Sequence, residues 1–123
     1  MTAIFVYGTL KTGGSNHSFM VGQALIGQSR TAPGYTLYEL FGYPGLIPMV
    51  GDSEGVAGEL WSVDDAALCR LDALEGTDEG LYRRAPIELV GEFSGLRVDT
   101  YFYLRSVEGR RRIGAEWTGC QHI

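Results

Sequence analysis

Short runs of β-branched and aromatic residues recur along the chain, separated by glycine, proline, aspartate and serine. Runs of this kind fit strands, and the residues between them favour turns. Eighteen glycines among 123 residues also indicate many turns, bulges and close backbone approaches. The expected strands span residues 2–7, 35–40, 46–50, 56–63, 82–90 and 97–104. The pattern predicts a curled, mainly antiparallel sheet.

Length and composition describe one small domain. With 123 residues, 45% of them hydrophobic, the chain is long enough for one core and too short for two ordinary domains. No apolar run reaches about eighteen residues, and the first one meets Gly8 before it could form the core of a secretory signal. We therefore expect a cytoplasmic protein. Fifteen acidic against ten basic residues, a net charge of −5, argue against nucleic acid and an anionic membrane as partners.

One helix is expected, over residues 64–76. Asp64 can cap its first turn, and Gly76 is a natural residue for a left-handed stop. At about 100° per residue, the apolar side chains of the segment share one arc, and Glu75 projects among them. These apolar residues are Ala67, Leu68, Leu71 and Leu74. The spacing predicts that Glu75 points toward the core.

A carboxylate directed at a core must be neutralised, hydrogen-bonded, ion-paired or placed at the wall of a cavity. The last arrangement would make Glu75 a catalytic acid or base. In the alternative, Glu75 turns to solvent or pairs with Arg83 or Arg84, and helix geometry does not decide between the two. Glu59, on the expected strand 56–63, is the second candidate for a carboxylate that faces a cavity.

Metal chemistry has little support in the sequence. The chain has two cysteines and two histidines, in no spacing typical of a metal site. We expect Cys69 and Cys120 to be free thiols. His17, next to Asn16, is expected to fix the local loop, and the run of arginines at 110–112 to form a solvated tail.

Several motifs follow one another in order along the chain. They are F-V-Y-G-T-L-K at 5–11 with N-H at 16–17, G-E-L-W at 58–61, L-D-A-L-E-G at 71–76, L-Y-R-R at 81–84 and Y-F-Y at 101–103. This ordered set resembles the gamma-glutamylcyclotransferase family, and more narrowly its AIG2-like, gamma-glutamylamine cyclotransferase branch. The resemblance runs from residue 4 to about residue 105.

The resemblance implies an α+β, mainly β, fold: a small closed or nearly closed mixed β-barrel with one main α-helix and a cavity at one end. It implies a single domain over 1–123, with a core of 2–105 and a C-terminal tail of 106–123. Members of the family act without a cofactor on a small-molecule gamma-glutamyl substrate. The α-amine of the substrate attacks its own γ-carbonyl, which gives 5-oxoproline and a free amine or amino acid.

By motif, the essential acid/base of the family falls on Glu75, which would act as base and then as acid. The turn that holds the glutamyl group falls on Tyr7, Gly8, Thr9 and Leu10. Tyr82 resembles a tyrosine that lines the family's cavity, and Tyr103 is a further candidate for substrate binding. A non-catalytic binding module that uses the same cavity, or a plain interaction domain, remains open, as does the choice between monomer and homodimer. The sequence does not name the leaving amine.

Overall fold

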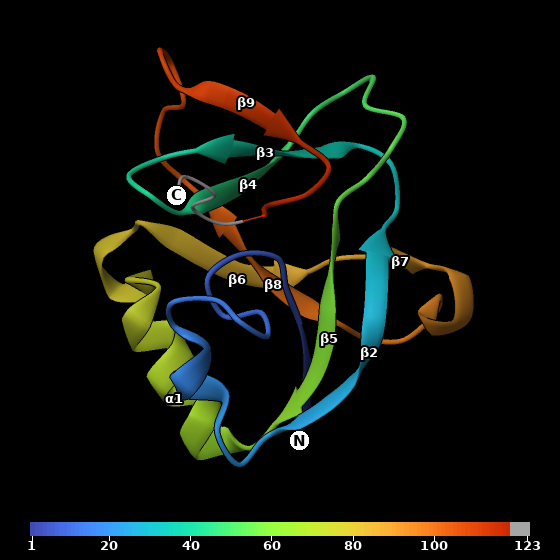
Figure 1. The fold of residues 1–123 in the computed structure, drawn as a ribbon, viewed down its shortest axis with the longest axis vertical. Coiled ribbons are helices and arrows are strands. Elements are labelled where there is room, and N and C mark those ends of the chain that lie inside the picture. The colour runs from blue at the N-terminus through green and yellow to red at the C-terminus, as the bar shows by residue number, and fades with distance from the viewer. Residues whose placement is uncertain (119–123) are drawn as a thin grey trace.

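The structure, a computed structural model, describes residues 1–118, in which nine strands form one mixed sheet (Figure 1). The strands are β1 Thr2–Val6, β2 Ala24–Thr31, β3 Tyr35–Glu39, β4 Pro44–Pro48, β5 Ala57–Val63, β6 Tyr82–Pro86, β7 Leu89–Val90, β8 Asp99–Tyr103 and β9 Arg111–Gly114. Their order in the sheet is β7-β2-β5-β1-β8-β4-β3-β9, with β6 paired to β8. The helix α1 spans Asp65–Leu74, and three 3-10 turns are η1 His17–Met20, η2 Thr77–Glu79 and η3 Gly91–Phe93.

The sheet splits beside β8, and this split creates room for a site. The antiparallel partner β6 occupies one edge of β8 along its whole length, from Asp99 to Tyr103. On the other edge, β1 runs parallel to the start of β8 at Ile4, and β4 runs parallel to its later part at Leu46. β1 therefore borders only the start of β8, and β4 occupies the same edge of β8 further along.

The strands β7 and β9 at the two ends of this order do not pair with each other within residues 1–118. The sheet is thus strongly curled but open, as Figure 1 shows. The mainly β class with one main helix is confirmed, and of the two expected forms of the barrel the fully closed one is not found.

Alternate residues of the central strands fill two separate hydrophobic clusters, as the period of a strand requires. In β1, Ile4 and Val6 pack in a cluster that includes Ala67 and Leu71 of α1. Phe5, between them, belongs to the cluster on the opposite face. The helix therefore covers one face of the sheet only (Figure 1).

The helix has the predicted ends. The Asp64 carboxylate accepts a hydrogen bond of 2.8 Å from the N–H of Ala67, and Gly76 lies in the left-handed region with a φ of 66°. Glu75 is the residue that follows the last helical turn. No helix within residues 1–118 has the length and apolar character needed to cross a membrane.

Two strands were not predicted, and one predicted strand is interrupted. β2 carries a register shift between Leu25 and Gly27, which breaks its strand pattern. β9 lies in the segment predicted as a tail and pairs with β3. The expected strand 82–90 is divided into β6 and β7 after Pro86, since proline has no N–H to continue a ladder. Cys69 is exposed and free, whereas Cys120 lies outside the described residues.

Candidate functional site

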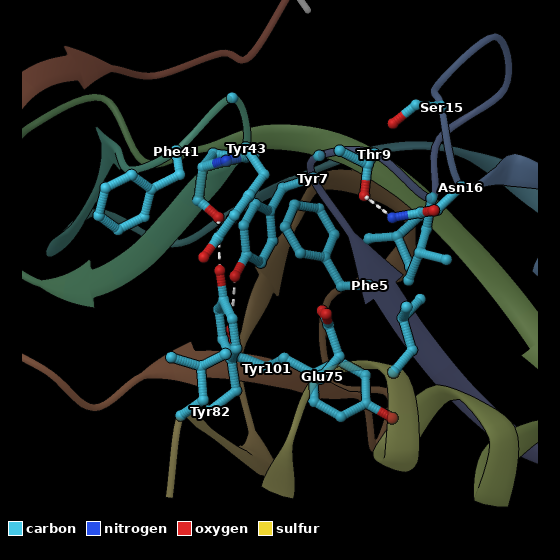
Figure 2. A pocket seen from close by; sticks show the side chains of 17 residues that line it. Phe5, Tyr7, Thr9, Ser15, Asn16, Phe41, Tyr43, Glu75, Tyr82 and Tyr101 are labelled. Carbon is cyan, nitrogen blue, oxygen red and sulfur yellow. Dashed lines mark hydrogen bonds between the residues drawn. The ribbon is translucent and has the colours of Figure 1, made fainter. Parts of the chain in front are cut away.

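A cavity of about 400 Å³ opens where β1 ends and β4 begins. Its walls come from segments far apart in the sequence: the turn after β1, the turn between β3 and β4, the end of α1, and the strands β6 and β8 (Figure 2). Of the residues predicted for the site, six line this cavity: Tyr7, Gly8, Thr9, Leu10, Glu75 and Tyr82. The structure thus brings the predicted acid and the predicted binding turn together.

The turn after β1 offers backbone donors to the cavity. The N–H groups of Gly8, Thr9 and Leu10 have no hydrogen-bond acceptor within residues 1–118. The carbonyl of Gly8 accepts a 3.0 Å bond from the N–H of Lys11, which closes the turn. Buried peptide N–H groups are rarely left unpaired, so this turn is suited to an oxygen-rich ligand.

Gly8 is required by the protein itself as well as by any ligand. A Cβ atom at this position would lie 2.6 Å from Cγ and 2.8 Å from Cδ of Pro44, the first residue of β4. Contacts this short force one of the two segments to move. Glycine at this position lets the end of β1 and the start of β4 meet at the split.

The loop after the turn is fixed by its own side chains. The Asn16 side chain donates a 3.0 Å hydrogen bond to Oγ1 of Thr9, and its N–H donates to the Thr9 carbonyl. The Nδ1 atom of His17 lies 3.0 Å from the carbonyl oxygen of Leu10, so this nitrogen carries the proton and donates. The predicted loop-fixing role of Asn16 and His17 is confirmed.

Glu75 directs its side chain into the cavity (Figure 2). Its carboxylate has no hydrogen bond or salt bridge to any described residue. Burial among the cavity walls raises the pKa of Glu75 from 4.5 to about 7, because removal of water disfavours the charged form. At neutral pH the group is therefore poised between its two forms, as a base that later acts as an acid requires.

Arg84 is held by other acids, and does not neutralise Glu75. Its guanidinium donates to both carboxylate oxygens of Asp72, at 2.9 and 3.2 Å, and to Asp99 at 3.1 Å. Asp72 also accepts a 2.6 Å bond from the Tyr101 hydroxyl. This network fastens the last turn of α1 to β6 and β8. The alternative in which Glu75 pairs with Arg84 is not observed, because Arg84 pairs with Asp72, which precedes Glu75 by about one helical turn.

Tyr7, Tyr82 and Tyr101 line the cavity that holds Glu75, but their hydroxyls bond to other groups. The Tyr7 hydroxyl bridges the split in the sheet: it donates to the Tyr101 carbonyl at 2.6 Å and accepts from the Leu46 N–H at 3.3 Å. The Tyr82 hydroxyl donates to the Pro44 carbonyl at 2.8 Å. Burial, together with the nearby Glu75 charge, raises the pKa of both Tyr7 and Tyr82. These tyrosines supply walls and rigidity and remain protonated.

Tyr103 does not line the cavity. Its ring packs edge-on against the ring of Tyr82, with 5.3 Å between centroids, behind the cavity wall. Phe41 and Tyr43 also line the cavity, although neither was among the predicted site residues. Both belong to the turn between β3 and β4, and only the folded chain places this turn opposite Glu75 (Figure 2).

Glu59 faces away from this cavity, toward a second one of about 500 Å³. Its buried carboxylate accepts hydrogen bonds from the Thr12 N–H at 2.9 Å, from Nε1 of Trp61 at 3.1 Å and from Gln28 at 3.4 Å. Burial alone would raise the pKa of Glu59, but these hydrogen bonds outweigh it and the pKa is lowered. Glu59 is therefore an anchor for the loop that follows the binding turn.

Replacement of Glu59 by glutamine is expected to lower the free energy of unfolding by about 1–2 kcal/mol, since charge-assisted hydrogen bonds become neutral ones. Urea unfolding measures this loss, and faster hydrogen exchange at the Thr12 amide would locate it in the loop. Glu92→Gln removes an exposed carboxylate from the same second cavity and is the matched control. Equal stability of the two variants would contradict the anchoring role.

Comparison with known proteins agrees with this geometry. The family model described as gamma-glutamyl cyclotransferase, AIG2-like, matches residues 4–119. A Vibrio cholerae protein with a provisional gamma-glutamylcyclotransferase name is 45% identical over 85 residues, which cover 69% of this chain and 70% of that protein. The gamma-glutamylcyclotransferase family protein YtfP of Escherichia coli K12 is 36% identical over 115 residues, which cover 93% and 94%.

Solved structures show the same fold. The solution structure of Escherichia coli YtfP has a TM-score of 0.68 at 35% identity, over 95% of this chain and 96% of that one. The crystal structure of a mouse AIG2-like protein has a TM-score of 0.68 at 30% identity, over 86% and 78%. The names of these relatives support an activity of the gamma-glutamylcyclotransferase type. The chain belongs to the AIG2-like gamma-glutamylcyclotransferase family.

Proposed function

We propose that this protein converts a gamma-glutamyl amide to 5-oxoproline and a free amine or amino acid, with Glu75 as general base and then general acid. One observation supports the proposal above the others. A carboxyl group with a pKa of about 7 and no protein partner shares a cavity of about 400 Å³ with three unpaired backbone N–H groups.

The proposed reaction moves two protons, one after the other, from the substrate's α-ammonium nitrogen to the leaving nitrogen. Glu75 accepts a proton from the substrate's α-ammonium group, and the freed nitrogen attacks the γ-carbonyl carbon to form a new C–N bond. The bond from that carbon to the leaving nitrogen then breaks as Glu75 returns the proton to the departing amine. The ring nitrogen still carries one proton too many, and Glu75 passes this second proton to the freed amine, which departs as an ammonium group and leaves the ring amide with one hydrogen. Atoms and charges then balance without water, a redox partner or a cofactor.

The binding turn has the complementary task in this proposal. Attack on the γ-carbonyl places negative charge on its oxygen, and fixed N–H donors can stabilise that charge. Thr9 and Leu10, which follow Gly8, supply such donors at the cavity wall. Because the nucleophile is tethered to its target, the cavity has mainly to select the curled conformer of the substrate.

Incubation with a panel of gamma-glutamyl amines and gamma-glutamyl-amino acids tests the proposal, with 5-oxoproline measured by mass spectrometry. Release of 5-oxoproline from at least one class is expected. Binding without turnover, seen as thermal stabilisation by these compounds, would instead favour a non-catalytic binding module.

The acid limb of the pH profile is expected to report Glu75. Because kcat/KM follows the free enzyme, it should fall about tenfold per pH unit on the acid side of the Glu75 pKa. Burial raises that pKa to about 7, so the midpoint is expected there and not near 4.5. Initial rates at low substrate concentration across pH 5–9 measure it. A midpoint that stays near 4.5 would contradict the desolvation of Glu75.

A further inference from the structure

The three arginines at 110–112 do not form one solvated tail. Arg111 pairs with Glu39 at 2.6 Å, and Arg112 pairs with Asp52 at 3.0 Å. Arg110 has a different neighbour: its guanidinium carbon lies 4.0 Å from the centroid of the Phe41 ring. Of the three, Arg110 alone has no salt bridge to an acid within residues 1–118.

Phe41 places Arg110 beside the candidate site. It lies in the tight turn from β3 to β4, which is closed by a 2.9 Å hydrogen bond from the Leu40 N–H to the Tyr43 carbonyl. The residue is 68% exposed and yet lines the cavity that holds Glu75, so its ring forms part of the mouth. The Arg110 guanidinium therefore contacts a residue of the cavity mouth.

The contact with Phe41 leaves hydrogen-bonding capacity unused. A guanidinium group that stacks on an aromatic ring uses its face, and its N–H groups stay available around the edge. No described residue accepts a hydrogen bond from the Arg110 side chain. In a protein of net charge −5, this is an unneutralised cation held in place near the mouth of a site.

Resting on the proposed function, we infer that Arg110 selects substrates whose leaving group carries a carboxylate beside the amide nitrogen, that is, gamma-glutamyl-amino acids over gamma-glutamyl amines. The glutamyl half occupies the inner part of the cavity, between Glu75 and the turn at Thr9. The departing half then extends toward Phe41, which lies on the far side of Tyr7 and Tyr43 from Thr9 (Figure 2). A carboxylate there meets the free edge of the guanidinium, the geometry that arginine binds best.

Two substrates that differ only in this carboxylate provide the test: gamma-glutamyl-L-alanine and gamma-glutamylethylamide. The wild-type protein should prefer the alanine compound. Arg110→Gln is expected to lower kcat/KM for that compound by about 10- to 100-fold, the usual cost of losing a hydrogen bond to a charged group. Its kcat/KM for the ethylamide should stay close to the wild-type value. Arg111→Gln, which removes the neighbouring arginine paired with Glu39, should leave both values unchanged.

The outcomes separate the two proposals. If the wild-type protein releases 5-oxoproline from neither compound and from no member of the wider panel, the proposed function itself fails. If it acts on them but Arg110→Gln leaves their kcat/KM ratio unchanged, the inference about Arg110 is overturned while the cyclotransferase activity stands. An unchanged ratio includes an equal loss of kcat/KM on both compounds, which would mean that Arg110 acts only by holding Phe41.

Discussion

Replacement of Glu75 by glutamine is expected to lower kcat for 5-oxoproline formation by about 10²- to 10⁴-fold, the range that a positioned general base contributes. Glutamine has the shape of the glutamate and fits the same cavity wall, but it cannot accept a proton from the substrate's ammonium group. Substrate binding should change less than kcat, because the turn at Gly8 to Leu10 is left intact. Initial rates at saturating substrate measure the loss.

The control for this variant is Glu88→Gln, which removes an exposed carboxylate just before β7. It should retain wild-type activity, which shows that loss of one negative charge is not the cause. Circular dichroism should show that both variants are folded. A Glu75→Gln protein with wild-type kcat would remove the proposed mechanism, although family membership would stand.

The helix and the direction of Glu75 could be predicted because both depend on local signals. Asp64 caps the chain three residues before its partner amide, and Gly76 provides the left-handed stop. Between fixed ends, the helical period leaves little freedom for Glu75. Whether the Glu75 side chain pairs with Arg84 or faces a cavity depends on Asp72, because Asp72 forms the salt bridge with Arg84. Such pairing between residues on different elements cannot be read from local sequence.

The missed strands depend on partners far away in sequence. β2 is interrupted by the shift at Gly27 and exposes Leu25, so its own residues do not alternate clearly, and it is stabilised by pairing with β5. β9 is rich in arginine, yet it pairs with β3 along an edge. Phe41 likewise reaches the cavity because β4, which follows its turn, pairs with β8. Such placements follow from topology, which the sequence patterns did not contain.

Burial by itself does not give a carboxyl group a useful pKa, as Glu59 and Glu75 show. Both carboxyl groups are shielded from water, which disfavours the charged form of each. Glu59 receives several donors and its pKa falls, so at neutral pH it stays charged as an anchor. Glu75 receives none and its pKa rises. The difference in donors assigns the two groups opposite roles, and strand or helix periodicity alone could not reveal it.

The same unpaired burial is expected to reduce the stability of the folded protein at neutral pH. The pKa of Glu75 is about 7 in the folded protein, whereas its ordinary value of 4.5 applies to the unfolded chain. Below 4.5 the group is protonated in both states, and it imposes no charge-burial penalty. As pH rises toward 7, only the unfolded chain loses the proton, so the free energy of unfolding falls, by up to about 3 kcal/mol. Above pH 7 the group is charged in both states, and the free energy of unfolding falls no further because of Glu75.

Glu75→Gln removes this titration, so its stability relative to the wild type should depend on pH. Urea unfolding at pH 4, 5.5, 7 and 8.5 would measure the difference in free energy between the two proteins. We expect that difference to shift in favour of Glu75→Gln by up to about 3 kcal/mol between pH 4 and pH 8.5. Glu88→Gln, which removes an exposed carboxylate just before β7, is the matched control for the loss of one charge. If the difference in free energy between Glu75→Gln and the wild type does not change with pH, Glu75 ionises as readily in the folded protein as in water. Glu75 would then lack the raised pKa that the proposed mechanism requires of a group that both accepts and donates the proton.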